Sequence, residues 1–266
     1  MSGYSFNKTD LTKKGTGLKY ADHFVCFSDD VLGLSLNSLT SEEFNSFVCL
    51  CSFFNNDTCS GDENDTFSAA VCFKSFYNRL FKNSVGKSLR SKEYAFNILQ
   101  SLLCKLVKHS FFKRGELICL NKPSVVSKND FYNYSIYCNF GSESTIRYCN
   151  AKPLHGVSFI QKICVEDILR LKYVHSKILY LYFIKFLNVK NKRTGKSSFF
   201  LSHNAFCYAL GVTERCSKYK SLFDKRVIDK ATEDLFRLFD VELVEEFKDR
   251  YTFIYTKRDS VLEVVT

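Results

Sequence analysis

Proline and glycine are scarce in this chain, and their scarcity restricts the possible folds more than any other feature. Only 2 prolines and 11 glycines are spread over 266 residues. The many tight turns of an all-β sandwich and long flexible linkers both depend on these residues. The sequence therefore predicts helices with a few strands. The chain has 45% apolar and 25% charged residues, which is an ordinary composition for a globular protein. Its length favours two domains of about 150 residues or less.

The positive charge is concentrated in two segments. The formal net charge is +10, and residues 74–128 and 151–198 carry net charges of +10 and +8, whereas residues 1–73 carry −6. Such a segregated positive field attracts polyanions. Nucleic acid is therefore the first partner to consider, and an anionic membrane surface is the second.

Twelve cysteines raise the question of disulfides or zinc. No Cys-x-x-Cys pair occurs, so a structural zinc site has no support, and we expect most thiols to act as small core side chains. The N-terminal residues contain no apolar segment typical of a secretory signal, and the longest apolar stretch, 178–187, is interrupted by Lys185. We therefore expect a cytoplasmic protein with no metal and no cofactor.

Both halves of the chain show a similar order of predicted elements. In the first half, Thr40 and Glu43 form a capping-box pattern, and apolar residues recur every three to four positions from Tyr94 to Leu106. The predicted elements there are a helix at 41–54, a strand at 66–72, helices at 73–81 and 91–109, and strands at 116–120 and 134–140.

The second half begins with a predicted long helix at 165–188 and a basic loop at 190–196. A strand at 198–201 precedes a helix at 203–210, which has Ser202 as N-cap and ends at Gly211. In the next helix, 217–238, apolar residues form one face, and Lys218, Lys225, Asp229 and Thr232 are predicted to point away from it. A hairpin of 241–246 and 251–256 follows.

This shared order predicts an α+β, mainly helical fold with two tandem winged-helix domains, each a helix-turn-helix followed by a β-hairpin wing. We expect an N-terminal arm or mobile lead-in at 1–37, the first winged-helix domain at 38–150, and the second, as the main DNA-reading domain, at 151–266.

Motifs for catalysis are not found. The Gly-Lys-Ser triplets at 86–88 and 195–197 lack the earlier glycine of a phosphate-binding loop. A tyrosine that cuts DNA beside a metal ion needs a pair of histidines two positions apart to hold the metal, and the five histidines include no such pair. No arrangement typical of nucleophilic catalysis stands out. We therefore expect no enzymatic activity.

The last third resembles the initiator proteins of iteron-type plasmids. The resemblance is carried by the stretch 174–186, by Leu210-Gly211 and by the stretch beginning at Tyr219, with Phe223, Lys225, Arg226, Val227 and Ala231. Tyr180 or Tyr182 stands where the family has a Leu-Tyr pair. The resemblance is strong over 165–258, and extends to about 40–260 through the order of elements.

This resemblance implies a replication initiator that binds origin repeats in double-stranded DNA, promotes origin melting with host replication proteins, and represses its own gene as a dimer in equilibrium with the monomer. Basic and polar side chains on the third helix of each predicted domain, and on the wings, would contact bases or phosphates. The candidates are Ser91, Lys92, Asn97, Lys105, Lys108, Lys113, Arg114, Lys196, Lys218, Lys220, Lys225, Arg226, Lys230, Lys248, Arg250, Lys257 and Arg258.

Three alternatives stay open on the sequence alone. A winged-helix transcription regulator would use the same chemistry on DNA. A basic scaffold or membrane-surface protein would bind anionic vesicles without sequence preference on DNA. An enzyme such as a nuclease, with a site assembled from distant residues, would reveal itself by metal-dependent cleavage.

Overall fold

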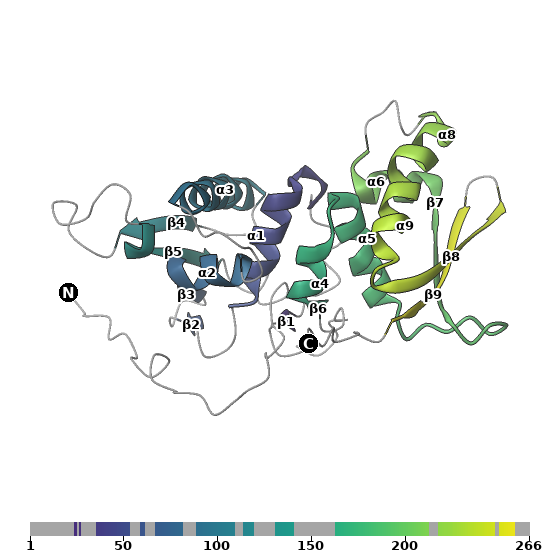
Figure 1. Ribbon diagram of the computed structural model, residues 1–266, viewed down its shortest axis with the longest axis horizontal. Coiled ribbons are helices and arrows are strands. Elements are labelled where there is room, and N and C mark those ends of the chain that lie inside the picture. Colours follow the sequence, from purple (N-terminus) through teal and green to yellow (C-terminus); the bar gives the residue numbers. More distant parts are fainter. Residues whose placement is uncertain are drawn as a thin grey trace, which may run out of the picture.

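The computed structural model describes residues 24–25, 27, 36–53, 59–61, 67–81, 89–109, 114–119, 131–140, 163–212, 218–247 and 250–258. These residues form helices and small antiparallel sheets (Figure 1). Figure 1 shows an elongated molecule with α3 (Leu89–Lys108) and β5 (Tyr134–Phe140) at one end, α8 (Lys220–Phe223) and β8 (Phe239–Phe247) at the other, and α5 (Val174–Lys185) between them. The predicted α+β fold, mainly helical, is confirmed at this level.

The first half is built around a four-stranded sheet of order β2-β3-β5-β4. Helix α1 starts as the sequence predicts, because Thr40 Oγ1 accepts the Glu43 N–H at 3.2 Å and Glu43 Oε2 accepts the Thr40 N–H at 2.8 Å. The elements are β1 (Phe24–Val25), the 3-10 turn η3 (Leu36–Ser38), α1 (Ser41–Cys51), β2 (Cys59–Gly61), β3 (Phe67–Cys72), α2 (Phe73–Leu80), α3 (Leu89–Lys108), β4 (Arg114–Cys119), the 3-10 turn η4 (Phe131–Asn133) and β5 (Tyr134–Phe140).

The second half is built around a three-stranded sheet of order β7-β9-β8. Its elements are β6 (Ile163–Cys164), α4 (Val165–Arg170), α5 (Val174–Lys185), β7 (Ser197–Ser202), α6 (His203–Leu210), α8 (Lys220–Phe223), the π-helical turn η5 (Asp224–Ile228), α9 (Asp229–Leu235), β8 (Phe239–Phe247) and β9 (Arg250–Lys257).

The two halves share one topology. In each, a strand leads into two successive helices and then into an antiparallel hairpin, whose second strand pairs with the first strand of the unit. The units are β3-α2-α3-β4-β5 and β7-α6-α8/α9-β8-β9. The repeated order predicted from the sequence is therefore confirmed.

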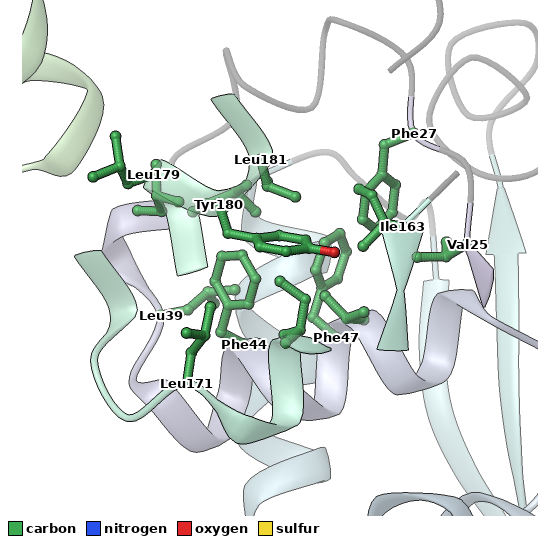
Figure 2. Close-up of a cluster of buried hydrophobic side chains, with 14 of the residues drawn as sticks. Val25, Phe27, Leu39, Phe44, Phe47, Ile163, Leu171, Leu179, Tyr180 and Leu181 are labelled. Carbon is green, nitrogen blue, oxygen red and sulfur yellow. The ribbon is translucent and has the colours of Figure 1, made fainter. Parts of the chain in front are cut away.

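A continuous buried cluster joins the halves (Figure 2). Tyr180 of α5 lies at its centre, with Phe44 and Phe47 of α1 on one side and Phe27 and Ile163 on another. Phe27 stacks on Phe47 with 5.6 Å between the ring centroids. The packing of α1 against α4 and α5 thus places both units on a common core.

Part of the expected N-terminal arm belongs to this core. Strand β1 pairs antiparallel with β6, and Val25 and Phe27 are fully buried. The arm interpretation is therefore wrong for these residues, because the apolar segment around Phe24 finds a distant strand partner. The remainder of the expected arm before η3, like the predicted domain boundary at 150, lies outside the described residues.

The predicted long helix over 165–188 is wrong, because the structure divides it into α4 and α5. Leu171 adopts an extended backbone with φ −77° and ψ 135°. The Asp234 carboxylate accepts hydrogen bonds from the backbone N–H groups of Lys172 at 2.7 Å and Tyr173 at 3.3 Å. These amides therefore have a partner outside a helix, and the chain bends at 171–173.

Described thiols are divided between core and surface. Cys49, Cys51, Cys138 and Cys207 are buried, while Cys72 and Cys104 are exposed. The expected role as core side chains holds for the first group, and burial raises the pKa of the Cys49 thiol to about 12. None of the helices in the described part of the chain is long and apolar enough to cross a bilayer.

Candidate nucleic-acid interface

Helix α6 is fixed at both ends by the residues that the sequence indicated. Ser202 Oγ accepts the Ala205 N–H at 3.2 Å, and Gly211 ends the helix in a left-handed conformation with φ +59°. Phe206, Cys207 and Leu210 are buried. These contacts fix which side of α6 is exposed and the direction in which the chain leaves the helix.

The residues from Lys220 to Leu235 form the helix that carries the best candidate contacts, and we call it the reading helix. Phe223, Val227, Ala231 and Leu235 are buried, as predicted. Lys225, Arg226 and Lys230 are exposed, as is Lys218 just before the helix. A fixed apolar face and a basic exposed face are what a helix needs to present cations to a duplex groove.

One predicted orientation on this helix is wrong. Thr232 is buried, with its hydroxyl lacking a hydrogen-bond partner. The π-helical turn η5 lies between the two α-helical parts. Because a π turn holds more residues than an α turn, it changes which positions face inward, and Ile228 is buried beside Val227.

A hydrogen-bonded chain anchors the start of the reading helix. The Tyr251 hydroxyl of β9 donates to Asp224 Oδ1 at 2.5 Å, and His203 Nδ1 of α6 lies 3.4 Å from the same hydroxyl. Phe223 packs against the rings of His203 and Tyr251. The reading helix, α6 and β9 are therefore held together by these side chains. At the same place, the Lys220 ammonium lies 5.4 Å from the centre of the Tyr251 ring.

The hairpin of β8 and β9, the predicted wing, positions its cations at both ends. Arg250 begins β9, and its guanidinium stacks 3.4 Å above the Phe200 ring of β7, while its Nε is buried without a hydrogen-bond partner. Lys257 and Arg258 lie at the opposite end of the hairpin and face acids. Lys257 is 3.6 Å from Asp167, and Arg258 is 2.5 Å from Asp240.

The first half places fewer of its candidates on an open surface. Asn97 and Lys108 of α3 are exposed. Lys92 is half-buried, with its ammonium 4.1 Å above the Tyr132 ring, and Lys74 of α2 lies 5.7 Å from the same ring. Two cations from different helices thus contact one aromatic ring.

Lys105 and Arg114 have acidic partners instead. Lys105 Nζ lies 2.6 Å from Glu43 Oε2 and also donates to the Ser38 carbonyl at 3.2 Å. Burial by itself would raise the pKa of Glu43, but hydrogen bonds from Lys105, the Thr40 N–H and Ser101 bring it below its usual value. Arg114 is 2.9 Å from Glu116. Lys105 therefore supports the capping box of α1.

Some candidates are not placed. Lys113, Lys248 and the side chain of Ser91 lie outside the described residues, and Lys196 is exposed on the loop before β7. The structure brings together Lys220, Lys225, Arg226 and Lys230 along one helix, with Lys218 just before it. Across the described residues, no group of three or more His, Cys, Asp or Glu side chains converges in a way suited to a metal ion.

Sequence reasoning missed the residues that position the cations. Phe200, Asp224, Tyr251 and Tyr132 supply the rings and the carboxylate that hold Arg250, the reading helix and Lys92. A partial signal was available, since aromatic residues in a strand beside a predicted basic hairpin favour stacking with arginine. The hydrogen bond between Asp224 and Tyr251 joins positions whose distance in sequence gives no such signal.

Comparisons with known proteins support the fold. No protein-family model matches the sequence, and no curated protein matches it. Among solved structures, the chain is similar to the Pi initiator protein, whose crystal structure was determined in complex with iteron DNA. The TM-score is 0.58 at 13% sequence identity, over 90% of this chain and 98% of the other. The two chains therefore share a fold.

Proposed function

We propose that this protein is a replication initiator that binds repeats in double-stranded origin DNA through two winged-helix domains. The observation that carries the proposal is the reading helix, whose apolar face is buried while Lys225, Arg226 and Lys230 are exposed. A chain of the same fold was solved on iteron DNA. The topology that occurs twice supports two winged-helix units.

The proposed contacts fall into two classes. Lys225, Arg226 and Lys230 read base edges or neutralise phosphates from the reading helix, since lysine and arginine pair with guanine in the major groove. Arg250 at the wing, with Lys92, Asn97 and Lys108 of the first half, contacts backbone phosphates, which position a protein without specifying sequence. Lys257, Arg258 and Lys105 contribute less, because each already faces an acid.

The remaining parts of the proposal rest on the resemblance at Leu210, Gly211, Phe223, Lys225 and Arg226. They are origin melting with host replication proteins, repression of its own gene as a dimer, and a site of action in the cytoplasm. The proposal includes no enzymatic step. Repeats beside the gene distinguish an initiator from a winged-helix transcription regulator, because only the initiator needs them for replication of the linked DNA.

The test measures binding of the full chain to duplexes that tile the DNA around its gene, against a scrambled duplex, over a series of salt concentrations. Wild type should prefer one duplex by about 10³ or more, with a steep salt dependence. The double variant Lys225→Glu/Arg226→Glu should lose this preference.

The control is Arg170→Glu/Lys172→Glu, which reverses the same number of exposed charges outside the reading helix and should keep the preference. Equal binding of wild type to all duplexes would refute the proposed function. Binding to anionic vesicles, without preference on DNA, would instead identify a membrane-surface protein.

A further inference from the structure

The connection between α5 and β7 is a strongly basic turn that the reading helix does not include. Residues 190–196, which we call the basic turn, contain Lys190, Lys192, Arg193 and Lys196, and all four are exposed. No acidic residue occurs anywhere from 168 to 213. No ion pair neutralises Lys192, Arg193 or Lys196 within the described part of the chain.

Backbone and side-chain hydrogen bonds give the basic turn a defined shape. The Gly195 N–H donates to the Asn191 carbonyl at 2.8 Å, and the Asn191 N–H donates to the Lys196 carbonyl at 2.8 Å. Asn191 Oδ1 also accepts the N–H groups of Arg193 at 2.9 Å and Thr194 at 3.2 Å. Gly195, with φ +69°, supplies the left-handed step. A turn ordered in advance loses little conformational entropy when it binds.

The basic turn lies at the opposite end of β7 from the start of the reading helix, because Leu201 pairs with Tyr251, whose hydroxyl donates to Asp224, whereas Ser197, next to the basic turn, pairs with Tyr255. Figure 1 shows it at the lower right, whereas α6 and α8 are at the top. Strand β7, with 6 residues, separates the basic turn from the start of α6. At about 3.3 Å per residue this strand spans about 20 Å. A duplex that runs parallel to β7 would therefore reach the basic turn about six steps of about 3.4 Å beyond the start of α6.

The surface chemistry favours phosphates over a protein partner. Protein interfaces have cores of apolar and aromatic side chains, and from 188 to 196 the only apolar side chain is Val189. Exposed cations without apolar neighbours recognise a regular array of anions through charge alone. A duplex backbone offers such an array along its length.

We propose that the basic turn binds the phosphate backbone of duplex DNA outside the site read by the reading helix, about six base pairs or more beyond it. This inference rests on the proposed function. It makes Lys192, Arg193 and Lys196 a second, sequence-independent contact, so that affinity depends on the length of duplex flanking the recognised site.

The experiment compares two duplexes with the full chain: the shortest one that retains the sequence preference, and the same site extended by about ten base pairs on each side. Wild type should bind the extended duplex about tenfold more tightly or better, with a salt slope larger by up to about 2.7 for three phosphate contacts. Lys192→Ala/Arg193→Ala/Lys196→Ala should bind both duplexes equally and keep its preference over scrambled DNA.

The matched control is Arg170→Ala/Lys172→Ala/Arg237→Ala, which removes three other exposed cations and should keep the length dependence. If wild type has a sequence preference but no length dependence, the inference is wrong and the proposed function stands. If wild type has no preference for any duplex, the proposed function itself fails. If the triple variant loses binding to anionic vesicles but not to DNA, the basic turn is a membrane contact.

Discussion

Lys177 shows how much a single residue depends on neighbours that are distant in sequence. It is fully buried on α5 and donates to the Ser41 carbonyl at 3.1 Å and to the Ser41 hydroxyl. The Ser41 hydroxyl donates in turn to the Lys172 carbonyl at 2.7 Å. Burial lowers the pKa of Lys177 to about 8, although the charges of Glu42 and Asp234 oppose this shift.

The stability of the protein should therefore rise with pH through the action of this lysine. Between about pH 8 and 10 the folded chain holds fewer protons on Lys177 than the unfolded chain does, so rising pH favours the fold. The free energy of unfolding of wild type, relative to Lys177→Met, should increase by about 2 to 3 kcal/mol from pH 7 to pH 10. Chemical denaturation at a series of pH values measures it.

The Lys177→Met variant serves as the reference for wild type, because ionisation of the buried tyrosines and cysteines changes the stability of both proteins equally and cancels in the difference. A difference that stays constant over this pH range would mean that Lys177 ionises equally in the folded and unfolded chains, contrary to the prediction.

At the scale of elements, features set by nearby residues were predictable. The capping box of Thr40 and Glu43, the N-cap Ser202 and the left-handed Gly211 all depend on neighbours within a few positions. The division between α4 and α5 was not predictable, since it depends on Asp234. The π turn and the ion pair of Lys105 with Glu43 likewise depend on tertiary contacts.

Gly211→Ala tests how closely α6 approaches η3. An added Cβ would lie 2.3 Å from the Asn37 side chain, on a residue with φ +59°. Gly195 has a similar φ of +69°, but a Cβ there would meet nothing within 4 Å. Both substitutions force a left-handed alanine, at about 1–2 kcal/mol, and Gly211→Ala should cost at least about 1 kcal/mol more because of the overlap.

Thermal and denaturant unfolding of the two variants measure this difference. Asn37→Gly removes the overlapping atoms and should restore part of the loss in the Gly211→Ala background but not in the Gly195→Ala background. Equal losses in the two single variants would show that α6 moves away from η3 without cost.

At the scale of the whole molecule, the two repeated units share one continuous core. The exposed cations of the reading helix were predictable because they follow helical spacing, whereas the shared centre was not, because it is built from segments as distant as Phe27, Phe47 and Tyr180. Such a centre predicts that the units depend on one another for stability, even though each has its own sheet.

Unfolding should consequently occur in a single cooperative transition. Phe76 of α2 and Phe253 of β9 are fully buried in opposite halves, and replacing either with alanine should cost about 3–5 kcal/mol. Each variant should shift the same transition, when followed by circular dichroism and by calorimetry. Two separate transitions, each sensitive to one variant only, would mean that the units unfold independently.

The pairing of β1 with β6 also affects the order in which the chain folds during synthesis. Phe24 pairs with Cys164, and Phe27 lies beside Tyr180 of α5. Contacts between positions this distant in sequence slow folding, because the long stretch of chain between β1 and β6 must close into a loop before they form. As the chain leaves the ribosome, the first unit therefore keeps part of its apolar surface uncovered until β6 and α5 have emerged. A pause in translation before that point would prolong the exposure of this surface, and would give chaperones more time to bind it.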